Sequence, residues 1–273
     1  MPAGAWPLSS ADPSQAAPDQ PRPFNPMNRM DLASQIATNL ATVNARIEAA
    51  AAEAGRAPSD IRLIAVSKMF GPGHAAAAAA AGLHGLGENK VQEALQKQQA
   101  TTGLPIRWHL IGHLQSNKAR RAATAFDWIH VVDSVDLLQR LDRAATEVGG
   151  APKLLIQVDL AGEATKHGAP VAEVRRIIDA AETCRSAVVR GLMVLPPRSD
   201  DPEATRPYFR RLRLLRDELR TAGPGRSPLD QLSMGMSHDF ETAIAEGATM
   251  VRVGTALFGP RPAVDSPPAA TAT

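Results

Sequence analysis

The sequence predicts a single (β/α)8 TIM barrel, an α/β fold, with one additional helix before the first strand. Eight short β-prone runs alternate with segments of helical period, which is the pattern of a parallel sheet with helical crossovers. The 273 residues suit one such barrel, which typically takes about 250 residues. An open doubly wound sheet would show the same alternation. The count of eight, and the lack of a Gly-rich dinucleotide fingerprint after the first strand, favour the closed barrel.

The elements are expected in the following order. A leading helix over residues 31–54 is indicated by apolar residues at the i, i+3, i+4, i+7 spacing of one helix face. Strands are expected at Arg62–Val66, Leu83–Gly87, Arg107–Gly112, Trp128–Asp133, Lys153–Leu160, Val188–Leu195, Leu229–Met234 and Met250–Gly254. Between them, helices are expected at about 73–81, 89–99, 116–124, 135–148, 170–186, 202–222 and 238–247.

Two flanking segments are expected to lie outside the barrel, which spans residues 29–260. Residues 1–28 are rich in Pro, Ala and Ser and bury too little apolar surface to offset their ordering entropy, so we expect them to be disordered. Translation starting at Met27 or Met30 is compatible with this composition. Residues 261–273 are expected to form a second, flexible tail.

The composition excludes several classes of protein. A net charge of +2 gives no basis for nucleic-acid binding, and the basic stretch 210–220 also carries Asp217 and Glu218, as a solvated helix face does. The alternative is that helix 202–222 docks a protein partner. The single cysteine, Cys184, allows no internal disulfide and is expected to be buried. No run is long enough to span a bilayer and no secretory signal is apparent, so we expect a cytoplasmic protein without membrane contact.

The carboxyl end of the first strand carries a lysine. In (β/α)8 barrels, function gathers where the strands end and the βα-loops begin. Lys68 shares the parity of Ile64 and Val66, so it faces the barrel axis if they do. A desolvated lysine there can attack a carbonyl as an amine. The alternative is an edge lysine that reaches into water.

The seventh and eighth strands end in segments suited to a phosphate group. Gly254 and Thr255 follow the eighth strand and offer open backbone and a hydroxyl, although a plain turn would look the same. After the seventh strand, Ser237 stands where a helix N-cap belongs. Phosphate sites commonly form after strands seven and eight of such barrels. Arg252 lies in the eighth strand, facing either the axis or the helices, and needs a polar partner in both cases.

Six segments in this order resemble the YggS/PROSC family of pyridoxal-phosphate-binding proteins, whose barrel is similar to the barrel half of alanine racemase. The segments run from residue 60 to residue 260. They are Ala65–Lys68, Gly87–Glu93, Trp108–Lys118, Gly191–Met193, Leu232–Ser237 and Met250–Gly259. One departure is Leu110, where the family usually has an aromatic residue or Met. The resemblance implies a fold type III barrel that binds pyridoxal 5'-phosphate (PLP).

The resemblance also implies a role for each matching position. Lys68 resembles the lysine that forms the Schiff base, and Arg252 the arginine that faces the pyridine nitrogen. Asn89 is similar to a residue beside the cofactor ring. Lys166 resembles a mobile second lysine that helps to transfer the cofactor, although a solvated loop lysine is an equal alternative. The implied phosphate-binding residues are Ser237, Gly254 and Thr255, with Ser233 as a further candidate.

Two functions compete on this basis. The resemblance implies a monomeric carrier that serves vitamin B6 homeostasis, with transient contact to PLP-dependent apoenzymes and no reaction of its own. The alternative is a PLP-dependent racemase, which needs an acid/base on each face of the substrate. The similar racemases take their second acid/base, a tyrosine, from a further domain for which the chain after the eighth strand leaves no room. The one tyrosine, Tyr208, is expected in the outer helical ring, so the carrier is favoured.

Overall fold

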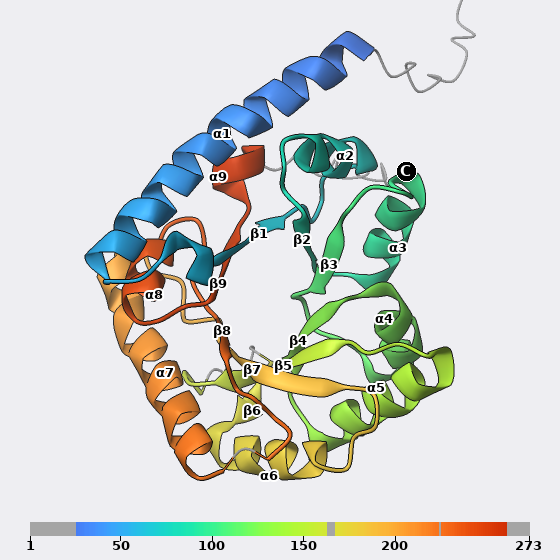
Figure 1. Cartoon of the computed structure of the whole chain (residues 1–273), viewed down its shortest axis with the longest axis vertical. Helices are drawn as coiled ribbons and strands as arrows, with labels where there is room; N and C mark the ends of the chain where they lie inside the picture. The colour runs from blue at the N-terminus through green and yellow to red at the C-terminus, as the bar shows by residue number, and fades with distance from the viewer. Residues whose placement is uncertain (1–25, 163–166, 224, 261–273) are drawn as a thin grey trace, which may run out of the picture.

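The computed structural model describes residues 26–162, 167–223 and 225–260. Within them, eight parallel strands form a closed ring, because β4 pairs with β5 as well as with β3 (Figure 1). The barrel strands are β1 (Arg62–Val66), β2 (Gly85–Glu88), β3 (Arg107–Leu110), β4 (Trp128–Val132), β5 (Lys153–Asp159), β7 (Val188–Met193), β8 (Gln231–Ser233) and β9 (Met250–Val253). A two-residue strand, β6 (Ala169–Pro170), pairs with β5 outside the ring. The predicted (β/α)8 barrel is confirmed.

Helices surround the ring of strands (Figure 1). They are α1 (Pro26–Glu53), α2 (Pro72–Ala80), α3 (Val91–Ala100), α4 (Ala119–Ala125), α5 (Val135–Val148), α6 (Val171–Ala181), α7 (Arg206–Thr221), α8 (Phe240–Ala245) and α9 (Thr255–Phe258). Three 3-10 turns accompany them: η1 (Pro58–Asp60), η2 (Ser116–Lys118) and η3 (Pro202–Thr205). The additional helix, α1, packs on α2, α8 and α9, so it bridges the two sides of the β1–β9 junction.

The structure corrects several predicted boundaries. Helix α1 begins at Pro26, so residues 26–28 belong to it and not to the N-terminal extension. Proline is compatible with the first turn of a helix, where its missing N–H has no partner to lose. The expected strand at Leu83–Gly87 is instead Gly85–Glu88. Helix α9 was not predicted, because its four residues are too short to show a period. The predictions for residues 1–25 and 261–273 lie outside the described residues.

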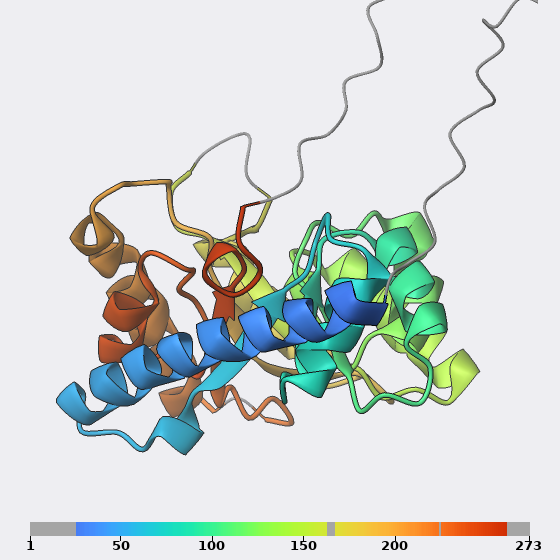
Figure 2. The ribbon, with the colours of Figure 1, turned by 90° about the horizontal axis from the view of Figure 1, so that it is seen from above.

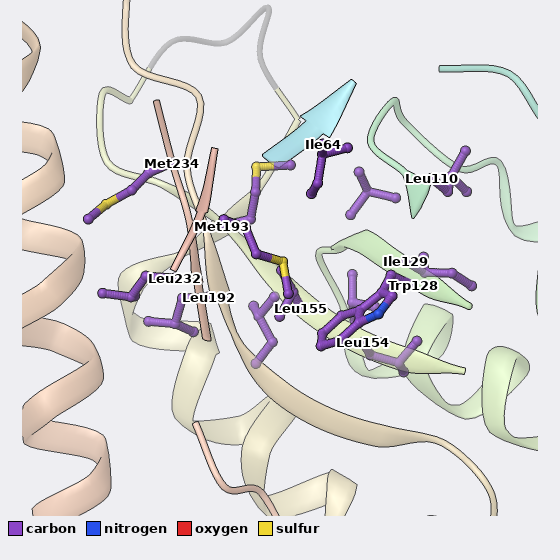
Figure 3. Packing of buried hydrophobic residues seen from close by; sticks show 14 of the residues in the cluster. Ile64, Leu110, Trp128, Ile129, Leu154, Leu155, Leu192, Met193, Leu232 and Met234 are labelled. Carbon is purple, nitrogen blue, oxygen red and sulfur yellow. The ribbon is translucent and has the colours of Figure 1, made fainter. Parts of the chain in front are cut away.

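Side chains alternate between the inside of the ring and the layer beneath the helices. Ile64 and Met193 point into the ring, whereas Leu232 and Met234 point toward α7 (Figure 3). All four side chains are fully buried. Burying both faces of the strands is the usual state of a parallel sheet and accounts for their nearly continuous apolar sequences. The same alternation decides which polar residues near the strand ends face the barrel axis.

The basic face of α7 is used inside the molecule. Arg206, Arg210 and Arg213 each place a guanidinium 3.1–3.2 Å from a carboxylate oxygen of Glu246, whose side chain is 5% exposed. Burial alone would raise the pKa of Glu246, but the three guanidinium groups hold it below its ordinary value. Three arginines of this segment thus have a carboxylate partner within the molecule. Tyr208, on the same helix, packs against the hydrophobic core, as expected for the outer ring.

Two further expectations concern the thiol and membrane contact. Cys184 is a buried free cysteine, and burial raises its pKa to about 11, so the thiol stays protonated and unreactive. It lies in the turn after α6 and not within the helix, which ends at Ala181. Across the described residues, no helix has the length and apolar character needed to cross a membrane.

Candidate functional site

The lysine-bearing end of β1 lies beside the end of β9. Ile64 pairs with Arg252 and Ala65 with Val253, so the two strands run in parallel to the same edge of the barrel. Gly254 then packs against Val66, since a Cβ added at Gly254 would lie 3.3 Å from the Val66 carbonyl oxygen. The residues that follow these strands, Lys68 and Thr255, therefore share one rim of the barrel. In Figure 2, α9 lies at this edge of the barrel and the turn from α1 into β1 lies at the opposite edge.

Lys68 sits in a tight turn at the carboxyl end of β1. The Phe70 N–H donates to the Ser67 carbonyl at 3.1 Å, which closes the turn. Met69 has φ +69°, a conformation that costs a non-glycine residue on the order of 1–3 kcal/mol. The Met69 N–H donates to Glu93 Oε1 at 2.6 Å, which stabilises this strained backbone. Ser67 directs its hydroxyl toward Glu88. The inward direction that strand parity predicts for Lys68 stays a prediction, because Lys68 lies in the turn beyond β1.

Beneath this turn lies a buried ionic network that we call the Lys97 cluster, comprising Ser67, Glu88, Glu93 and Lys97. Lys97 Nζ donates to Glu88 Oε1 at 2.6 Å, to Glu93 Oε1 at 2.9 Å and to the Ser67 carbonyl at 2.7 Å. The Lys97 side chain is 2% exposed and that of Glu88 is fully buried. Burial raises the pKa of Glu88. The hydrogen bonds from Lys97 and Ser67 lower it, but burial has the larger effect. The cluster anchors the backbone on both sides of Lys68.

Arg252 faces the barrel interior and not the helices. Its Nη1 donates to Ser233 Oγ at 2.7 Å and its Nη2 to the Val194 carbonyl at 3.0 Å. Burial lowers the pKa of Arg252 to about 10, so the guanidinium remains charged at neutral pH. The polar partners that the sequence analysis required for this arginine are thus Ser233 and Val194. Ser233, the further candidate for the phosphate site, therefore contacts Arg252 in the barrel interior. The contact between Ser237 and Gly254 is a separate one.

Two histidines extend this contact through the interior. His130 Nδ1 lies 3.0 Å from Ser233 Oγ, and His130 Nε2 lies 3.0 Å from His109 Nδ1. Burial is the main reason that the pKa of His109 falls to about 3 and that of His130 lies well below its ordinary value. Both rings are therefore neutral at neutral pH. This interior chain was not predicted from the sequence, although His130 shares the inward parity of Trp128 in the same strand.

The segments after β8 and β9 meet through one hydrogen bond. The Gly254 N–H donates to Ser237 Oγ at 3.2 Å. The expected N-cap role of Ser237 is wrong, because α8 begins at Phe240 and Asp239 is its N-cap residue. Gly235, at φ +90°, makes this loop possible, since a Cβ there would lie 2.6 Å from the Ala243 Cβ. The structure therefore joins Ser237 to Gly254 directly, with the exposed Thr255 next in the chain.

Of the two remaining predicted residues, the structure describes Asn89 but not Lys166. Asn89 is half-buried at the end of β2, where Gly112 allows a close approach, since a Cβ at Gly112 would lie 2.5 Å from the Asn89 carbonyl oxygen. Lys166 lies outside the described residues. Within the described parts of the chain, no group of three His, Cys, Asp or Glu residues could hold a metal ion. The rim thus combines an amine, Lys68, with two hydroxyls, Ser237 and Thr255, above a buried arginine.

Comparison with known proteins relates most of the chain to one family. Residues 38–262 match the family model described as alanine racemase, N-terminal domain. The pyridoxal phosphate homeostasis protein of Pseudomonas aeruginosa is 44% identical over 230 residues, covering 84% of this chain and 96% of that protein. That of Aquifex aeolicus is 40% identical over 222 residues, covering 81% and 96%.

Solved structures agree with this relationship. PipY of Synechococcus elongatus PCC7942, solved with PLP bound, is 43% identical with a TM-score of 0.74, covering 82% of this chain and 100% of that one. Alanine racemase of Clostridium difficile 630 is 18% identical with a TM-score of 0.63, covering 85% of this chain and 58% of the racemase. At that identity the racemase supports the fold alone.

Proposed function

Because this chain belongs to the family of pyridoxal phosphate homeostasis proteins, we propose that it binds PLP through Lys68 and serves vitamin B6 homeostasis without catalysing a reaction. The observation that carries the proposal is the placement of Lys68, Arg252 and the Ser237–Gly254 contact at one end of one barrel. Elsewhere in the family the PipY structure holds PLP. Separate strands and loops supply these groups, so their convergence is a property of the fold.

The residues at this rim match PLP in their chemistry. PLP supplies an aldehyde for an amine to attack and a pyridine ring that can withdraw electrons. Lys68 offers the amine, and the strained turn and the Lys97 cluster hold its backbone in place. The hydroxyls of Ser237 and Thr255 can donate to a phosphate group, and Gly254, which packs against Val66, links the two segments through its bond to Ser237. Asn89 follows β2, the strand beside β1, where it can border the ring.

The properties of Arg252 favour a protein that carries PLP over one that uses PLP for demanding catalysis. Its guanidinium stays protonated at neutral pH, so it can face a pyridine nitrogen without giving up a proton. An unprotonated pyridine is a weaker electron sink. Racemisation also needs a second acid/base, and Tyr208 packs against the hydrophobic core from the outer helix α7. These two properties support a protein that holds its cofactor without turning over a substrate.

This absence of catalysis is open to a direct test. Purified protein loaded with PLP and incubated with L-alanine is expected to give no D-alanine or pyruvate above the level of free PLP. Chiral chromatography after removal of contaminating racemase measures both products. Multiple turnovers that persist through purification, and that disappear in the Lys68→Arg variant, would establish the racemase-like alternative instead.

The phosphate-binding segment carries its own prediction. Thr255→Val is expected to weaken PLP affinity by roughly 10-fold or more, because a hydrogen bond to a charged group is worth about 1.5–3 kcal/mol. The Thr255 side chain is exposed, so thermal stability should change little. Thr255→Ser, which keeps the hydroxyl, is the matched control. Equal affinity in all three proteins would remove Thr255 from the site.

The proposal extends to delivery of the cofactor. We infer that the protein is a cytoplasmic monomer that hands PLP to apoenzymes in transient encounters. Lys166, by its resemblance to a mobile second lysine, would help to transfer the cofactor. The family name of the relatives, which refers to homeostasis, supports a role in supply. Three arginines of α7, Arg206, Arg210 and Arg213, already pair with Glu246, so these three are not expected to form the contact surface.

A further inference from the structure

A second pocket opens at the end of the barrel opposite Lys68. It has a volume of about 650 Å³ and lies where β1, β2 and β3 begin, with α1 along one side. Its polar lining includes Arg62, His84, Arg107 and His109, and Leu40 and Ile106 contribute apolar surface. Binding sites for small organic molecules typically measure about 300–1,000 Å³. The size of this pocket is therefore that of a ligand site.

Two buried polar atoms at this pocket have no partner among the described residues, namely His109 Nε2 and Arg62 Nη1. The His109 side chain is fully buried. Its Nε2 is turned toward the pocket wall, since a Cβ added at Gly85, another lining residue, would lie 3.6 Å from that atom. An unpaired buried polar group costs about 1–3 kcal/mol, so these atoms call for a hydrogen-bonding partner from the pocket.

The interior hydrogen-bond chain fixes which kind of partner His109 needs. Arg252 can only donate, so Ser233 Oγ accepts from it. His130 Nδ1 is the one other partner of Ser233 Oγ among the described residues, so we assign the hydroxyl hydrogen to the bond with His130. His130 is then protonated at Nε2 and donates to His109 Nδ1. His109, being neutral, carries its hydrogen on Nε2. His109 Nε2, which faces the pocket, is consequently a hydrogen-bond donor that has no acceptor among the described residues.

The charge around this donor selects an anion. The Arg62 guanidinium lies 5.1 Å and Lys153 Nζ 5.2 Å from the Trp128 ring centroid, and that ring stacks on His109. Arg107 adds a third cation at the mouth. Among the described residues, none of these three cations forms an ion pair with a carboxylate. Burial is the main cause of the low pKa of His109, and the charges of these three cations lower it further. A carboxylate or phosphate would satisfy both the cations and the donor.

We propose that this pocket is a second ligand site, for a small organic oxyanion that accepts a hydrogen bond from His109 Nε2 and pairs with Arg62 and Arg107. The site is separate from the Lys68 rim, and the chain from His109 through His130 and Ser233 connects it to Arg252. It does not depend on the function proposed above, because none of its lining residues belongs to the rim.

Titration with inorganic phosphate and with succinate tests this site. Protein loaded with PLP is used, so that the phosphate-binding segment at Thr255 is already filled. Imidazole ¹⁵N NMR should show His109 protonated at Nε2, and at least one of the two anions should shift that signal saturably. Arg107→Gln should raise the apparent Kd for the anion by about fivefold or more, as expected for loss of a charge-assisted contact.

A matched substitution separates the site from general charge effects. Arg175→Gln removes an exposed arginine of α6 and should leave the Kd unchanged. Phosphate and succinate differ in the oxyanion they present, so the one that binds more tightly identifies the preferred group. The inference is overturned if neither anion shifts the His109 signal, if His109 is protonated at Nδ1, or if both arginine variants weaken binding equally.

Discussion

Replacing Lys68 by arginine is expected to abolish covalent capture of PLP. Arginine keeps the positive charge, but its guanidinium remains protonated and cannot attack the aldehyde. In the unmodified protein, borohydride treatment should add one reduced PLP per chain, located on Lys68 by peptide mass spectrometry. In the variant this added mass should disappear, and the apparent Kd for PLP should rise by about 100-fold or more, equivalent to about 2.7 kcal/mol.

The control for this result is another lysine near the same rim. Lys90 follows Asn89 and is exposed. Lys90→Arg should retain the full borohydride-stable mass and the affinity of the unmodified protein. Retention of the reduced adduct in Lys68→Arg, or its loss in Lys90→Arg, would contradict the assignment of the amine to Lys68.

Replacing Lys97 by methionine is expected to cause the largest loss of stability. The change leaves Glu88 buried without its cationic partner, and breaking one side of a buried ion pair costs about 3–5 kcal/mol. For a domain of this size, each kcal/mol lowers Tm by about 2–4 °C. Because Lys97 also holds the Ser67 carbonyl, PLP affinity should fall together with Tm. Calorimetry and PLP titration measure the two effects.

A double-mutant cycle separates the ion pair from simple loss of packing. Adding Glu88→Gln to Lys97→Met removes the stranded charge and should restore part of the stability, with a coupling of at least about 1 kcal/mol. Arg175→Met, which breaks an exposed pair with Asp179 on α6, should cost less than about 1 kcal/mol. Additive losses in the cycle would show that Lys97 and Glu88 do not act as a buried pair.

The barrel was predictable because its signals are local and repeated. Each strand is a short apolar run, each helix has its own period, and their count defines the closed sheet. Lys68 and Arg252 could be selected for a related reason, namely that strand parity and the position of a strand end are properties of consecutive residues. What the sequence left open, such as whether Arg252 faces the axis, was decided by its contacts with Ser233 and Val194.

The rest depends on residues far apart in the chain. Ser237 was expected to cap a helix because its local sequence has the composition of a cap, but its hydroxyl is bound by Gly254, 17 residues away. The Lys97 cluster joins a strand end to a helix, and the helix pattern alone gives no reason for Lys97 to be buried. His109 and His130 meet only because β3 and β4 are neighbours in the ring. Local patterns carry no information on such contacts.

The most direct test of the account is a crystal structure of the protein grown with PLP. We expect continuous electron density from Lys68 Nζ to the cofactor, the phosphate against Ser237, Gly254 and Thr255, and the pyridine nitrogen facing Arg252. Cofactor density joined to another lysine, or a phosphate bound away from the loops that follow β8 and β9, would contradict it.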